Sequence, residues 1–91
     1  MKWAVHCLDA ANAGDRRGAV LQDHLSYVAK SPLPIVLAGP LVTEGGKNFV
    51  GSLLIMQAER RSEVEAFVKA APFAEAGIWD QVRIDRFEPV S

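Results

Sequence analysis

The chain has 91 residues, 49% hydrophobic and 23% charged, a composition typical of one globular domain (residues 1–91) with a single core. Ten lysines and arginines against eleven aspartates and glutamates give a net charge of −1, too little basic surface to hold a phosphate backbone, so nucleic acid is not an expected partner. A single cysteine excludes an internal disulfide, and without a signal-peptide core or an apolar run of roughly 20 residues the expected location is the cytoplasm rather than a membrane.

The first elements follow from hydrophobic periodicity. Residues 2–9 (KWAVHCLD) alternate with both faces at least partly apolar, which predicts a strand. After a loop, Asp15 can cap a helix that runs to about Lys30 and ends before SPLP. Its expected inward stripe has the spacing i, i+4, i+7 and consists of Leu21, Leu25 and Val28.

The second half begins with a predicted hairpin. Residues 35–42 and 49–58 are apolar runs joined by EGGK, whose glycines suit a turn. Ser62 and Glu65 form a capping-box pattern at the start of a helix that ends at Pro72. The expected core-facing residues of this helix are Val64, Phe67, Val68 and Ala71. FAEAG can add one short turn, and residues 79–90 alternate like an edge strand.

The order strand, helix, strand, strand, helix, strand predicts an α+β fold of the ferredoxin-like type. Its four-stranded antiparallel sheet would carry both helices on one face. The two hairpin strands are nevertheless apolar on both sides, since Phe49, Leu53 and Ile55 alternate with Val50, Leu54 and Met56. The uncovered face needs another partner, most simply the same face of a second copy. We therefore expect a homodimer through the sheet face.

Two residues of the first helix are candidates for chemistry. Arg17 and His24 are seven residues apart, which on a helix places their side chains within roughly 20° of each other. A partly buried His24 could act as a general acid or base, while Arg17 holds a substrate carboxylate or enolate. The alternatives are a histidine that satisfies a backbone carbonyl and an arginine that is only solvated.

Two further side chains could complete such a site. Asp9, at the end of the first strand, is the best-placed carboxylate to orient His24, although it could equally be a turn residue. Ser52 is a polar residue in an apolar strand, so it either faces a pocket or makes an ordinary structural hydrogen bond. The histidines and the cysteine match no metal-ligand spacing, and no phosphate-cradling pattern is present, so neither a metal nor another cofactor is expected.

Several motifs in a fixed order carry a family resemblance. An arginine seven residues before HLSYV, then LAGPL, VGSLLI, APFAEAGIW and FEPV resemble the YciI-like (YCII-related) family across essentially the whole chain. The resemblance implies a ferredoxin-like dimeric α/β barrel with a site in the cleft between helix and sheet. It also implies a histidine and an aspartate as catalytic residues.

The resemblance extends to individual positions. His24 matches the family histidine, Arg17 the first arginine of its helix, Asp9 the acid after the first strand, and Ser52 the serine of its G-S pair. The family's G-P turn corresponds to Gly39 and Pro40. Two positions depart from the pattern: the usual D-P-F/Y is here Ala71-Pro72-Phe73, and a second arginine is replaced by Leu21. The first departure removes an acid, so the activity would rest on Asp9 or would have been changed or lost.

These observations support two main functional hypotheses. Relatives include muconolactone isomerases and a dehydrochlorinase of chlorinated hydroxyquinols, so the resemblance implies an enzyme of proton-transfer type, an isomerase or lyase, on a small cyclic or aromatic organic acid. Such an enzyme would use His24 as acid/base, Asp9 as its orienter, Arg17 as anion clamp and Ser52 as a pocket donor. The alternative is a non-catalytic small-molecule binding module or a purely structural dimer. RNA recognition is disfavoured because the FVGSLLIMQA strand offers a single aromatic ring.

Overall fold

The computed structural model describes residues 1–90, which form four strands and three helices. The strands are β1 (Lys2–Asp9), β2 (Ile35–Val42), β3 (Phe49–Gln57) and β4 (Trp79–Phe87). The helices are α1 (Gly14–Ala29), α2 (Arg61–Lys69) and the single turn α3 (Pro72–Glu75). The sheet order is β2-β3-β1-β4 and every neighbouring pair is antiparallel, which confirms the ferredoxin-like α+β fold.

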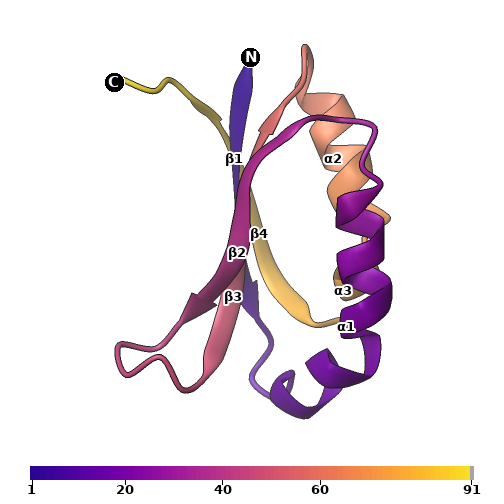
Figure 1. The fold of residues 1–91 in the computed structure, drawn as a ribbon, viewed down its shortest axis with the longest axis vertical. Coiled ribbons are helices and arrows are strands. Elements are labelled where there is room, and N and C mark those ends of the chain that lie inside the picture. The colour runs from indigo at the N-terminus through magenta and orange to yellow at the C-terminus, as the bar shows by residue number, and fades with distance from the viewer. Residues whose placement is uncertain (91) are drawn as a thin grey trace.

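The molecule has two layers, a twisted sheet and a layer of helices on one of its faces (Figure 1). The helix α1 faces strands β2 and β3, and α2 lies further along the same face of the sheet. The strands β2 and β4 form the two edges of the sheet, as the mixed composition of the last strand predicted.

The hydrophobic core lies between the helix face of the sheet and α2 with α3. Alternation along the strands explains it, because the residues that pair across β1, β3 and β4 point to the same side. Val5 pairs with Leu54 on one neighbour and with Ile84 on the other, and all three are buried. The helix stripe predicted for α2 is confirmed, and the largest core residues include Trp3, Met56, Val64, Phe67, Phe73 and Ile78.

The helix starts differ from the predicted caps. Asp15 was expected to cap α1, but the N-cap is Ala13 and Asp15 lies in the first turn, where its charge favours the helix dipole without a capping hydrogen bond. Ser62 was expected to cap α2, but the N-cap is Arg60, whose backbone N–H donates to the Glu63 carboxylate at 3.1 Å. The backbone turns helical two residues earlier than the Ser62 pattern implied, so Glu63 takes the capping role.

The inward stripe predicted for α1 is also corrected. The buried residues of this helix are Arg17 and His24, whereas Leu25 is 50% exposed and Leu21 and Val28 are half-buried. The physical reason is that α1 does not rest on β2 and β3 but borders an open pocket, so its leucines form a wall rather than a core.

Both faces of β3 are apolar, as expected, but one residue, Phe49, lies on the opposite face from the one predicted. Leu53 and Ile55 pair with β1 residues on the uncovered face, and Leu54 and Met56 lie on the helix face. Phe49, which was grouped with Leu53, instead lies on the helix side, where its ring centroid is 5.2 Å from Arg17 Cζ. The register shifts between Leu41 and Val42, and this irregularity reverses the alternation at the start of β3.

Candidate functional site

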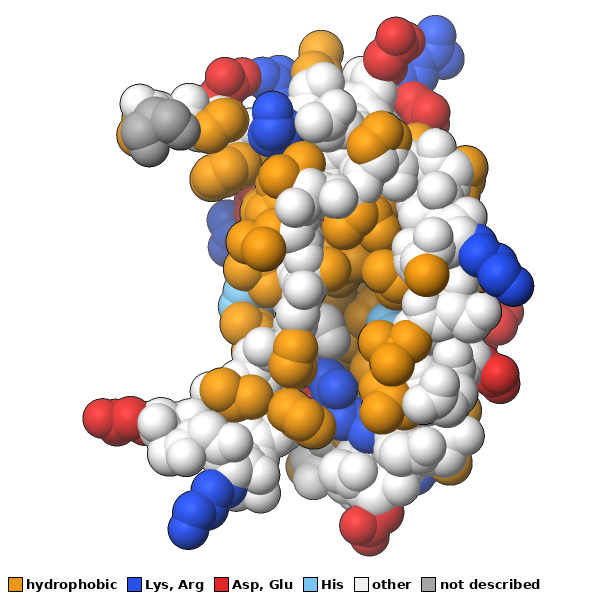
Figure 2. All heavy atoms as spheres, viewed as in Figure 1, with side chains coloured by type: hydrophobic (Ala, Val, Ile, Leu, Met, Phe, Trp, Pro, Cys, Tyr) orange, Lys and Arg blue, Asp and Glu red, His pale blue; other side chains and the backbone are white. Residues whose placement is uncertain are grey.

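A pocket opens between α1 and the β2–β3 hairpin. Figure 2 shows it as a hollow with apolar walls on the face of the molecule in view, with histidine and arginine side chains inside it. The space between its walls, with the open mouth included, is about 630 Å³. Its lining residues are Arg17, Leu21, His24, Leu25, Val28, Ala38, Gly39, Pro40, Phe49, Ser52, Leu53, Leu54 and Phe73.

Small residues on β2 help to keep the pocket open. Ala38 and Pro40 pair with Leu54 and Ser52, so they face the helix layer, and Gly39 contributes backbone between them. None of these three residues has a side chain long enough to reach α1. Gly39 and Pro40, which match the family's G-P turn, therefore lie within strand β2 and form part of one wall of the pocket.

Arg17 is fixed in the pocket by a buried ion pair. Its Nε donates to Asp9 Oδ2 at 2.6 Å and its Nη2 to Asp9 Oδ1 at 3.2 Å. Nη2 also donates to the Gly51 carbonyl at 2.7 Å and to Ser52 Oγ at 3.2 Å. Phe49 and Phe73 flank the guanidinium, with ring centroids 5.2 and 4.8 Å from its Cζ. These contacts hold the guanidinium in one orientation.

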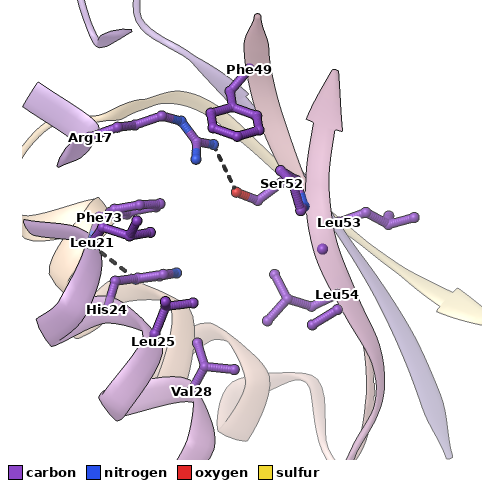
Figure 3. Close-up of a pocket in the computed structure, with 13 residues that line it drawn as sticks. Arg17, Leu21, His24, Leu25, Val28, Phe49, Ser52, Leu53, Leu54 and Phe73 are labelled. Atoms are coloured by element: carbon purple, nitrogen blue, oxygen red, sulfur yellow. Dashed lines mark hydrogen bonds between the residues drawn. The ribbon is translucent and has the colours of Figure 1, made fainter. Parts of the chain in front are cut away.

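Ser52 joins Arg17 to the aromatic cluster. Its Oγ accepts a hydrogen bond from Arg17 Nη2 and a second from Trp79 Nε1, each at 3.2 Å. Figure 3 shows the hydroxyl of Ser52 meeting the Arg17 guanidinium across the upper end of the pocket. Ser52 thus lines the pocket and also makes the structural hydrogen bonds that were the alternative.

His24 lies deeper in the same pocket and is held by aromatic contacts. Its ring stacks on Phe73 with a centroid distance of 3.8 Å and meets Trp79 edge-on at 5.3 Å. Its Nδ1 accepts a hydrogen bond from the Phe73 backbone N–H at 3.3 Å. The other ring nitrogen, Nε2, points into the space between α1 and β3 (Figure 3).

Burial sets the protonation state of the site. The pKa of His24 falls from its usual 6.5 to about 4, because burial disfavours the imidazolium and the Arg17 charge adds repulsion. Burial, with a smaller contribution from Asp9, raises the pKa of the Cys7 thiol to about 12. At neutral pH the imidazole is therefore neutral and the thiol is protonated, so Cys7 is no nucleophile.

The structure brings together Arg17, His24 and Ser52 but does not join Asp9 to His24. The Asp9 carboxylate accepts hydrogen bonds from Arg17, and the backbone N–H of Phe73, not Asp9, bonds His24 at Nδ1. Asp9 thus orients the arginine of the site. Ala71, which stands where the resembled family usually has an aspartate, is buried just before Phe73.

Three aromatic residues of the site were missed by the sequence analysis. Phe73 packs against both Arg17 and His24. Trp79 donates a hydrogen bond to Ser52, and the ring of Phe49 lies beside the Arg17 guanidinium. The APF motif could have predicted the burial of Phe73, because Pro72 begins a new helical turn and places this phenylalanine beside the core. Among residues 1–90 no cluster of three potential metal ligands occurs, and no helix is long and apolar enough to cross a membrane.

Fold and pocket together define a ferredoxin-like α+β protein with an arginine- and histidine-lined pocket between its first helix and its sheet. Within that class, the chain belongs to the YCII-related domain family, which matches residues 1–88. The family expected from the sequence motifs is thereby confirmed. A comparison with curated protein sequences found no match.

Among solved structures, the chain is similar to 5-chloro-2-hydroxyhydroquinone dehydrochlorinase from Burkholderia phenoliruptrix AC1100 in complex with 2,5-dihydroxybenzoquinone. The two share 31% identity with a TM-score of 0.88, over 97% of this chain and 94% of that one. A protein of Arabidopsis thaliana (13% identity, TM-score 0.53, 99% and 95% coverage) shares the fold. So does a Bacteroides thetaiotaomicron protein described as an antibiotic biosynthesis monooxygenase (12%, TM-score 0.59, 100% and 90%).

Proposed function

We propose that this protein is an enzyme of proton-transfer type, an isomerase or a lyase, that acts on a small hydroxylated ring bound in the α1–sheet pocket. The observation that carries the proposal is the convergence of Arg17, His24 and Ser52 in an otherwise apolar pocket. The similar dehydrochlorinase, which acts on a chlorinated hydroquinone and was solved with a hydroxyquinone, supports the choice of ring.

The pocket suits a reaction in which negative charge develops on a ring oxygen. When a proton moves between a ring oxygen and a ring carbon, or when a proton and chloride leave the ring, the intermediate is an enolate. Hydrogen-bond donors that are already oriented stabilise such an oxygen most strongly where water is excluded. Arg17 is the anion clamp, His24 the acid/base group and Ser52 an additional donor.

Asp9 has the supporting role in this proposal. By holding two nitrogens of the guanidinium, it fixes the direction in which Arg17 presents its remaining N–H groups. Gly39 and Pro40 form the wall against which the flat ring lies. The ring itself would pack between this wall and the leucines of α1.

A non-catalytic binding module is the second candidate. The observation that favours it is the position of Asp9, whose carboxylate is committed to Arg17 and leaves His24 without a carboxylate partner. This candidate predicts saturable binding of hydroxyquinones without turnover.

We further propose that the functional unit is a homodimer joined through the uncovered sheet face. That face carries exposed Leu8, Leu37 and Phe87 beside the half-buried Leu53. Burying these side chains against the same face of a second copy would remove the apolar surface that α1 and α2 leave uncovered.

The decisive experiment is to incubate the purified protein with 5-chloro-2-hydroxyhydroquinone, and separately with a muconolactone, and to measure chloride release or product by chromatography. We expect turnover that drops at least about a hundredfold in His24→Asn, with unchanged turnover in the control Gly18→Ala on the exposed side of α1. Saturable binding without any product would favour the binding module. Equal turnover in the wild type and His24→Asn would contradict the proposed site.

A further inference from the structure

Among residues 1–90, three polar side chains line the pocket, and each of them has a hydrogen to donate. Arg17 has no acceptor atom, and its Nε and Nη2 are engaged by Asp9, Gly51 and Ser52. Its Nη1 has no hydrogen-bond partner among residues 1–90. The two N–H groups of Nη1 are therefore free for a ligand in the pocket that this guanidinium lines.

Ser52 is forced to donate. A hydroxyl oxygen has two lone pairs, and those of Ser52 are taken by Arg17 Nη2 and Trp79 Nε1. What remains is the O–H hydrogen, which can only be given to an acceptor. Because Ser52 lines the pocket, that acceptor has to come from the ligand or from water.

His24 is forced into the same role by its backbone contact. The Phe73 N–H occupies the lone pair of Nδ1, so the neutral ring carries its proton on Nε2. Nε2 points into the pocket (Figure 3). The imidazole therefore presents an N–H there and has no lone pair with which to take a proton from a ligand.

No lining side chain offers an acceptor to balance these donors. Apart from Arg17, His24 and Ser52, the lining residues are aliphatic, aromatic, glycine or proline. A neutral phenol bound at these three side chains meets no side-chain acceptor for its own proton, and an unpaired O–H is costly in an apolar site. An ionised hydroxyl or a carbonyl oxygen carries no proton and fits all three donors.

We propose that the pocket takes its ligand through ring oxygens without a proton, as the ionised form of a hydroxylated ring, and that His24 acts as a neutral N–H donor rather than as a base. This inference rests on the proposed function, specifies the ionic form of its substrate, and gives His24 the role of a hydrogen-bond donor in place of the acid/base role assigned above.

The charged and titratable groups around the pocket support this assignment. Arg17, on the same helix, is the only charged residue among residues 1–90 that lines the pocket. The carboxylate of Asp9, from β1, bonds Arg17 rather than facing the ligand space. From α3 and β4, the groups that face His24 are the aromatic rings of Phe73 and Trp79. The low pKa of His24, near 4, agrees with a ring that stays neutral when an anion binds nearby.

The test uses 4-nitrocatechol, a hydroxylated ring whose visible spectrum distinguishes its neutral from its ionised form. We expect the bound spectrum to be that of the ionised form even below the pKa of the free ligand. Below that pKa the affinity should fall about tenfold per pH unit, because only the ionised fraction binds. A spectrum of the neutral phenol in the complex would overturn the inference.

Two variants separate a donor from a base at position 24. His24→Gln places an amide N–H where Nε2 lies but cannot titrate, and His24→Asn keeps only an acceptor for the Phe73 N–H. We expect His24→Gln to retain the affinity within about threefold and His24→Asn to lose about tenfold or more, the usual loss for a hydrogen bond to a charged group. Equal losses in both variants, together with proton uptake by the wild type on binding, would overturn the donor role.

The failure of this inference can be told from the failure of the proposed function. If the protein turns over the chlorinated hydroquinone but binds 4-nitrocatechol as the neutral phenol, only the ionic form and the role of His24 are wrong. If neither 4-nitrocatechol nor 2,5-dihydroxybenzoquinone binds, the proposed substrate class falls as well, and the inference with it.

Discussion

Arg17 has only 6% of its surface exposed, and a buried guanidinium is tolerated where its charge and its donors find partners. Asp9, Gly51 and Ser52 supply those partners and leave one nitrogen free. The ion pair thus does more than compensate a buried charge. It fixes which N–H groups face the pocket, and it makes Asp9 a positioning residue for Arg17.

The neutral state of His24 has a consequence for stability against acid. Its pKa is 6.5 in the unfolded chain and about 4 in the folded protein, so as the pH falls the unfolded state takes up the proton first. The stabilisation is complete above pH 6.5 and is lost as the pH falls toward 4, by about 3 kcal/mol. Denaturation followed by tryptophan fluorescence at pH 7.5 and at pH 4 measures this loss.

The matched control is His24→Gln, which keeps a polar side chain but cannot titrate in this range. Because the two proteins differ only at residue 24, the difference between their pH dependences isolates His24. Equal losses of stability in wild type and variant would show that the folded imidazole keeps an ordinary pKa.

The sequence predicted the residues of the site better than their contacts. Seven-residue spacing placed Arg17 and His24 on one helix face, and both are buried on that face. The partner of Asp9 could not be predicted, because the choice between Arg17 and His24 depends on how far α1 stands from β1. The role of Phe73 was hidden because its contact with His24 uses a backbone N–H, which carries no residue-specific signal.

At the scale of elements, the close approach of β1 and β3 determines where Arg17 can bind. A Cβ on Gly51 would lie 2.1 Å from the backbone oxygen of Cys7, so only glycine permits this pairing. The same residue offers its carbonyl to Arg17. The glycine therefore links the packing of two central strands to the geometry of the pocket.

Replacing Gly51 by alanine should destabilise the fold by about 3 kcal/mol, because the clash is with rigid backbone. The control is Gly18→Ala on α1, where an added Cβ meets nothing within 4 Å. There alanine should stabilise the helix by about 0.5–1 kcal/mol. Urea denaturation of both variants measures the two effects, and a Gly51→Ala protein as stable as the wild type would refute the steric account.

The order and type of the main elements followed from the sequence, while local irregularities did not. Alternation and helical spacing are properties of a whole segment, so they predicted all four strands and the α1 and α2 helices. The register shift near Val42 depends on how β2 and β3 pair, and it moved Phe49 from the expected face into the pocket. The cap of α2 was misplaced for a similar reason, since Glu63 bonds the backbone of Arg60.

At the scale of the whole molecule, the sheet has one face covered by helices and one face bare. Leu37 is 64% exposed on the bare face, opposite Ile55 of the neighbouring strand. The β4 side of this face carries Arg83 and Asp85, so the apolar area lies toward β2 and β3. A second copy of the chain would cover it by packing sheet against sheet.

Leu37→Asp should convert the proposed dimer to a monomer, because it places a charge in the apolar interface while adding little strain to the separate chain. Analytical ultracentrifugation of the wild type and the variant measures the mass directly. Leu25→Asp is the control, a similarly exposed leucine on the pocket side, and it should remain dimeric. A monomeric wild type would contradict the proposal.

The central claim is that the pocket between α1 and the β2–β3 hairpin binds a hydroxylated ring. The most direct measurement is a titration of ¹⁵N-labelled protein with 2,5-dihydroxybenzoquinone, followed by ¹H–¹⁵N correlation spectra. We expect saturable shifts at the backbone N–H of Phe73 and the indole N–H of Trp79, because these groups donate hydrogen bonds to His24 and Ser52. We expect them also at the amides of Ser52 and Gly39, because these residues line the pocket. Shifts confined to the bare sheet face, or no shifts at all, would contradict the central claim.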